Sequence, residues 1–108
     1  MTEPDTERLE QLLQFHERDP ADAFIAYGIA MEYVKAANVD RALEWFDKTL
    51  AIDGDYAYAW YQKAKLLSDD GRGAEALAAV EQGIAAAGRA NDAHAADELR
   101  ELRGALKG

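Results

Sequence analysis

The sequence contains no cysteine, and this absence removes several kinds of chemistry at once. Without thiols there is no disulfide, no thiolate nucleophile and no cysteine-ligated zinc site. No apolar run approaches the roughly 20 residues that a membrane-spanning helix needs. The acidic stretch of residues 1–5 also lacks the features of a secretory signal. We therefore expect a cytoplasmic protein that has no membrane partner.

Residues that commonly carry catalysis are also scarce. Ser68 is the only serine, and no histidine stands near it in the sequence. Residues 71–73 hold two glycines but lack the spacing and the preceding strand of a phosphate-binding loop. His94 and Glu98 are four residues apart on one predicted helix, but functional zinc sites need three or four fixed ligands. We predict no enzyme, no cofactor and no metal site.

Basic residues are outnumbered, so the chain carries a net charge of −9, with most of the excess acid in its first half. An acidic chain repels the phosphates of nucleic acid, so nucleic acid is not expected as a partner. Two interpretations of the acids stay open. They keep a small protein in solution, or they attract a basic partner to the N-terminal half.

Apolar residues recur every three to four residues along the whole chain, which predicts helices and no strand. Six helices are expected, over residues 6–18, 23–36, 39–52, 56–69, 73–87 and 91–106. Pro20 ends the first, because proline disfavours helical geometry in the residue before it. Asp22 is expected to cap the second helix, Gly54 to end the third in left-handed geometry, and Asp55 to cap the fourth.

Residues 24–88 repeat themselves with a period of 34 residues. The period places like on like: Phe24 on Tyr58, Tyr27 on Tyr61, Ala30 on Ala64, Ala42 on Ala76 and Gly54 on Gly88. A fixed period of this length is typical of stacked helical repeats. Gly83 lies inside a predicted helix, where glycine costs about 1 kcal/mol relative to alanine. We therefore expect two helices to approach closely at Gly83.

Helix–turn–helix units of this length, with alanines at the helix crossings, resemble the tetratricopeptide repeat. Trp60 matches a tryptophan that the family favours, whereas Lys63 stands where leucine is usual. The resemblance implies an all-α fold, with antiparallel helix pairs stacked as a short right-handed superhelix and a C-terminal capping helix. We predict one domain that consists of an N-terminal helix or half repeat (1–22), two repeat units (23–56 and 57–90) and the capping helix (91–108).

In the family that this chain resembles, the first helix of each unit lines a concave surface. The residues at the corresponding places form what we term the aromatic strip: Phe24, Tyr27, Met31 and Lys35 in the first unit, and Tyr58, Tyr61 and Lys65 in the second. Aromatic residues and methionine are enriched in protein interfaces. The resemblance therefore implies a groove that binds a peptide segment or a partner protein.

Two alternatives for the aromatic strip remain. A homodimer could bury it, or the terminal helices could cover it as part of the core. The lysine–asparagine clamp with which some family members hold a C-terminal carboxylate is absent, so a chaperone tail is not the expected ligand.

Overall fold

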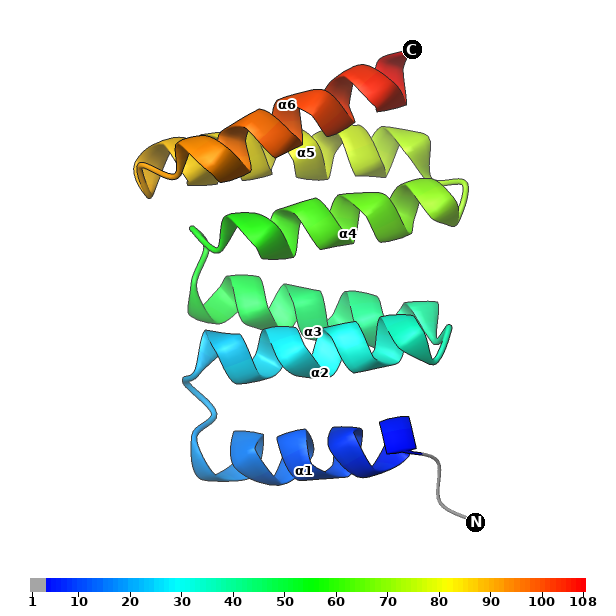
Figure 1. Ribbon diagram of the computed structural model, residues 1–108, viewed down its shortest axis with the longest axis vertical. Helices are drawn as coiled ribbons and strands as arrows, with labels where there is room; N and C mark the ends of the chain where they lie inside the picture. Colours follow the sequence, from blue (N-terminus) through cyan, green and yellow to red (C-terminus); the bar gives the residue numbers. More distant parts are fainter. Residues whose placement is uncertain (1–3) are drawn as a thin grey trace. The chain divides into compact units, whose positions relative to one another are not determined.

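The computed structural model describes residues 4–108 as six α-helices, without a β-strand in that range (Figure 1). The helices are α1 (Pro4–Arg18), α2 (Ala23–Lys35), α3 (Val39–Ile52), α4 (Ala57–Asp69), α5 (Gly73–Arg89) and α6 (Ala93–Lys107). The all-α prediction is confirmed, and each predicted helix is present with ends that differ by no more than two residues. The first three residues of the predicted segment 1–22 lie outside the described range. None of the six helices is long and apolar enough to cross a membrane.

The chain divides into two compact units, residues 1–52 and 53–108. The first unit contains α1, α2 and α3, and the second contains α4, α5 and α6. The predicted assembly of all segments into one domain stays a prediction.

In the first unit, α2 pairs with α3, and α1 packs against α2 (Figure 1). Pro20 follows the end of α1 as predicted. Asp22 caps α2, because its carboxylate accepts hydrogen bonds from the backbone amides of Phe24 and Ile25, at 2.9 and 3.3 Å. The core of this unit contains Ile29 of α2, which is fully buried. The cap and the core together fix which face of α2 points outward.

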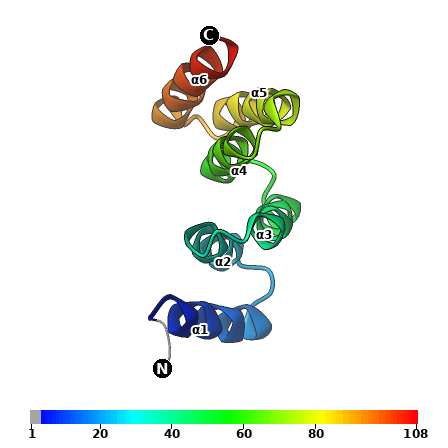
Figure 2. The same ribbon diagram turned by 90° about the vertical axis from the view of Figure 1, so that its right-hand side faces the viewer.

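In the second unit, α5 packs against both α4 and α6, and Figure 2 shows α5 on one side with α4 and α6 on the other. Gly83 lies at this junction. A Cβ atom at Gly83 would lie 2.8 Å from the Cβ of Trp60 and 2.9 Å from Cδ2 of Leu99. Both distances are shorter than van der Waals contact, so the prediction that Gly83 permits close packing is confirmed.

Two predictions about the start of the second unit are wrong. Asp55 does not cap α4, since its carboxylate instead accepts a hydrogen bond of 2.6 Å from Nε of Arg89 at the end of α5. Gly54 does not adopt a positive φ angle. Its carbonyl oxygen accepts a hydrogen bond of 3.0 Å from the indole nitrogen of Trp60, which fixes the turn by a side chain from the next helix.

Candidate functional site

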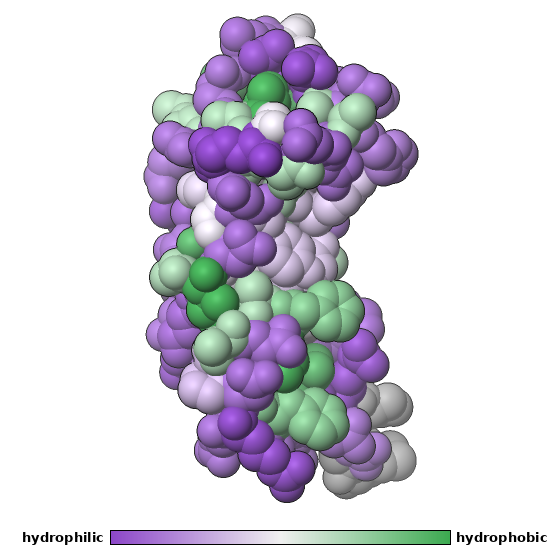
Figure 3. Space-filling view, turned by 90° about the vertical axis from the view of Figure 1, so that its left-hand side faces the viewer, coloured by the Kyte–Doolittle hydropathy of each residue, from purple (hydrophilic) through white to green (hydrophobic). Residues whose placement is uncertain are grey.

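The first-unit part of the aromatic strip lies on α2, where Phe24, Tyr27 and Met31 follow one another at three- and four-residue spacing. The side chain of Phe24 is 72% exposed. Tyr27 is half-buried, with its ring centroid 6.1 Å from that of the buried Phe46 of α3. Figure 3 shows hydrophobic side chains gathered in the lower part of the view, where α1 to α3 lie. This part of the strip therefore combines one solvent-exposed ring with residues anchored in the core.

Lys35, at the end of α2, takes part in a charge cluster that joins α2 to α1. Its Nζ lies 3.3 Å from Oε2 of Glu32, and Nε of Arg8 lies 3.2 Å from the same oxygen. Glu32 is only 5% exposed, and its other oxygen, Oε1, is buried without a hydrogen-bond partner among the described residues. A buried carboxylate needs such compensation, so Lys35 contributes to docking α1 as well as to the predicted strip.

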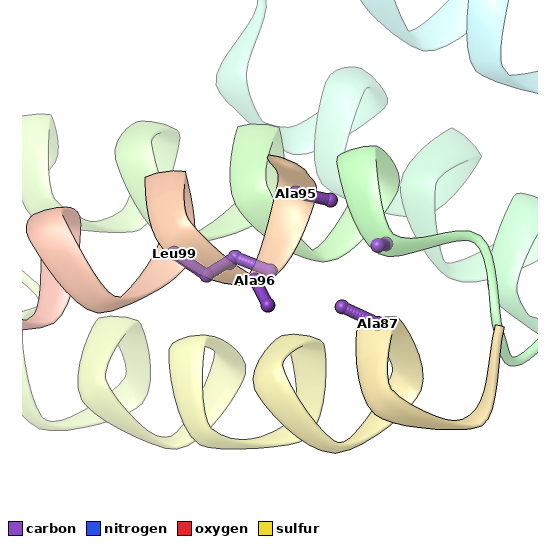
Figure 4. Close-up of a cluster of buried hydrophobic side chains, with 5 residues drawn as sticks. Ala87, Ala95, Ala96 and Leu99 are labelled. Carbon is purple, nitrogen blue, oxygen red and sulfur yellow. The ribbon is translucent and has the colours of Figure 1, made fainter. Parts of the chain in front are cut away.

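The second-unit part of the strip lies on α4 and packs against α6. Tyr58 and Tyr61 are half-buried, and their rings meet edge to face with centroids 6.4 Å apart. Both pack against a buried cluster, shown in Figure 4, that consists of Ala57, Ala87, Ala95, Ala96 and Leu99. Lys65 is exposed. In this unit α6 therefore covers part of the strip, and Tyr58 and Tyr61 contribute to the core.

A cleft of about 290 Å³ lies between α4 and α6. Its lining residues are Tyr61, Glu98, Glu101, Leu102 and Ala105. Oε1 of Glu98 lies 3.0 Å from Nε2 of His94, one turn earlier on α6. The repeat did not reveal the α6 residues, because α5 extends to Arg89 and α6 begins two residues later than the period requires. The amphipathic pattern of α6 itself was the better indication that these residues line a surface beside α4.

Lys63 lies at the rim of another cavity, of about 240 Å³, between α4 and α5. Its side chain is half-buried, with Nζ 5.5 Å from the centroid of the Trp60 ring. A lysine stem can cover an apolar surface while its amine stays at the edge, so the departure from the repeat is accommodated there. On the opposite wall, hydrogen bonds from the Arg72 guanidinium lower the pKa of the Glu75 carboxyl below its ordinary value.

The two histidines have different surroundings. His16 is half-buried and meets the ring of Trp45 edge to face at 4.8 Å, which agrees with its place on the apolar face of α1. His94 is exposed and paired with Glu98. Among the side chains that the structure describes, those of residues 6–108, no group of three or more His, Asp or Glu could hold a metal ion.

Comparison with protein-family models finds no match, and comparison with curated proteins finds none either. Among solved structures, the chain is similar to a tetratricopeptide repeat domain protein from Salinibacter ruber, studied by NMR. The two are 31% identical, the match covers 83% of this chain and 91% of that chain, and the TM-score is 0.78. The chain therefore belongs to the tetratricopeptide repeat family.

Two further structures share the fold at lower identity. One is the type III secretion chaperone SycD of Yersinia enterocolitica, solved with a peptide of the translocator YopD. It is 14% identical, the match covers 95% of this chain and 79% of that chain, and the TM-score is 0.85. The other is the TPR2B domain of yeast Sti1 in a complex with pHsp70. It is 19% identical, with 92% and 79% covered and a TM-score of 0.85. At these identities the likeness shows the fold alone.

Proposed function

We propose that this chain is a cytoplasmic protein-interaction module that binds a peptide segment of a partner protein through the aromatic strip and catalyses no reaction. The observation that carries the proposal is Phe24, a phenyl ring left 72% exposed on α2 beside the half-buried Tyr27 and Met31. Contiguous exposed apolar patches mark interaction surfaces, and in this one Phe24 supplies the exposed ring while Tyr27 and Met31 extend the apolar surface beside it.

Such a surface would gain binding free energy from the apolar side chains that a partner covers. Burying a phenylalanine side chain stabilises a complex by about 1.5–3 kcal/mol. Tyr27, Tyr58 and Tyr61 are already held by core contacts, so they would lose little conformational freedom on binding. Membership of the tetratricopeptide repeat family supports the proposal, as do the peptide of YopD bound to SycD and pHsp70 bound to Sti1.

The proposal is tested with Phe24→Ser, because Phe24 is exposed and its removal leaves the core intact. Ile52→Ser is the matched control, since Ile52 is 37% exposed at the end of α3 and lies outside the strip. Tyr27→Ala is less suitable, because Tyr27 contacts the buried Phe46.

Each form of the chain serves as bait for affinity capture from the native lysate, with captured proteins quantified by mass spectrometry. We expect the wild type and Ile52→Ser to retain the same partner and Phe24→Ser to lose at least about nine-tenths of it, as a loss of 1.4 kcal/mol implies. If Phe24→Ser and a Phe24→Ser/Lys65→Glu form both recover the partner at the wild-type level, the strip is not the binding surface.

A further inference from the structure

All four arginines of the second unit are paired with carboxylates of the same unit. The pairs are Arg72 with Glu75, Arg89 with Asp55, Arg100 with Asp97, and Arg103 with Glu81. The carboxylates at the cleft between α4 and α6 are different. Among the described side chains, Glu101 forms no ion pair, and Glu98 pairs only with His94. This cleft therefore carries negative charge that no arginine or lysine of the described chain neutralises.

The cleft also has apolar walls. Tyr61 supplies an aromatic ring from α4, and Leu102 supplies an aliphatic side chain from α6. Glu98 and Glu101 are three residues apart, so they lie on the same face of α6. Lys65, one turn beyond Tyr61 on α4, forms no ion pair with described residues and so leaves the carboxylates available.

We propose that this cleft receives one lysine or arginine side chain of the bound peptide, an inference that rests on the proposed peptide-binding function. The aliphatic stem of the basic residue packs between Tyr61 and Leu102, and its charged end meets the carboxylates of Glu98 and Glu101. A cation over an aromatic ring and beside a carboxylate is stabilised by both. The cleft is small for a whole organic ligand, and it lacks the third ligand that would favour a metal ion.

The test uses an array of short randomised peptides as the probe and the full chain as the binding protein. Glu98→Gln/Glu101→Gln removes both charges of the cleft while keeping the shape of its lining. The control is Glu81→Gln/Asp97→Asn, which removes the same number of charges from the same unit outside the cleft. Circular dichroism verifies that every variant keeps its helix content.

We expect the wild type and the control to select peptides with lysine or arginine at one fixed position. The Glu98→Gln/Glu101→Gln variant should bind such a peptide about tenfold more weakly, as two partly exposed charge pairs imply. Replacing the basic residue of the peptide by glutamine should cost the wild type the same factor, and the cleft variant nothing further.

Other results overturn the inference in distinguishable ways. If the wild type selects peptides without a preferred basic residue, or the cleft variant keeps the preference, the cleft has a different role while peptide binding stands. If no peptide binds the wild type better than it binds Phe24→Ser, the proposed function fails as well. If Glu98→Gln/Glu101→Gln abolishes a wild-type dimer, the occupant of the cleft is a second copy of the chain.

Discussion

Gly83 shows how a single missing side chain sets the spacing of three helices. Replacing it with alanine improves helix propensity by about 1 kcal/mol. The added methyl group would collide with Cβ of Trp60 and with the fully buried Leu99, and neither can move freely. Overpacking of this kind costs typically 1–3 kcal/mol. We therefore expect Gly83→Ala to lower the free energy of unfolding by about 1 kcal/mol, as measured by urea denaturation.

Gly104 provides the control, because it lies inside α6 and, apart from its own neighbours and helix backbone, no atom lies within 4 Å of the position that a Cβ would take. Gly104→Ala should raise the free energy of unfolding by about 0.5–1 kcal/mol through propensity alone. If both variants stabilise the chain equally, the packing role of Gly83 is wrong.

The sequence predicted some residue roles and concealed others. Gly83 could be interpreted correctly because a glycine inside a helix is unfavourable unless close packing requires it. Thr49 could not, although it is fully buried. Its hydroxyl donates a 2.8 Å hydrogen bond to the carbonyl oxygen of Trp45 in the same helix. A threonine whose hydroxyl bonds to the backbone of its own helix can be buried, and the spacing of apolar residues does not predict such a position.

At the scale of the element, α1 differs from the other helices because none of its described residues is fully buried. It is joined to α2 by apolar residues that remain half-exposed and by the contact of Arg8 with Glu32. Segments with few buried contacts open at a lower free energy than the rest of a protein. We therefore expect the backbone amides of α1 to exchange with deuterium faster than those of α2 and α3, as measured by mass spectrometry.

Arg8→Ala should speed exchange in α1 further, because it removes one of the two cations that compensate the buried Glu32 carboxylate. Arg41→Ala provides a comparison, since Arg41 pairs with the exposed Glu44 of its own helix. Equal protection of α1 and α2 in the wild type would contradict this account of α1.

Helix boundaries could be predicted wherever a local signal sets them, as with Pro20 after α1 and Asp22 before α2. They could not be predicted where a residue distant in sequence sets the boundary. Arg89 donates a hydrogen bond to the Asp55 carboxylate, which therefore does not cap α4. The same limit applies to the candidate site. Tyr58 and Tyr61 were identified by the repeat, but their packing against α6 depends on where a helix outside the clear repeat comes to lie.

At the scale of the whole molecule, peptide binding and self-association make opposite predictions about oligomeric state. A stable dimer interface buries roughly 1,000 Å² or more, whereas most residues of the strip are already half-buried and only Phe24 is an exposed large apolar residue there. Two chains of net charge −9 also repel each other, most strongly at low salt. We expect sedimentation velocity at micromolar concentration to show a monomer in 50 and in 500 mM salt.

A dimer that forms in the wild type, strengthens as salt rises and disappears in Phe24→Ser would favour the self-associating alternative instead. Ile52→Ser should leave such a dimer unchanged, because Ile52 lies outside the strip. Salt distinguishes the two functions further. Added salt screens repulsion between two like-charged copies, but it also screens attraction between this acidic chain and a basic peptide. Rising salt should therefore weaken peptide binding, the opposite of its effect on self-association.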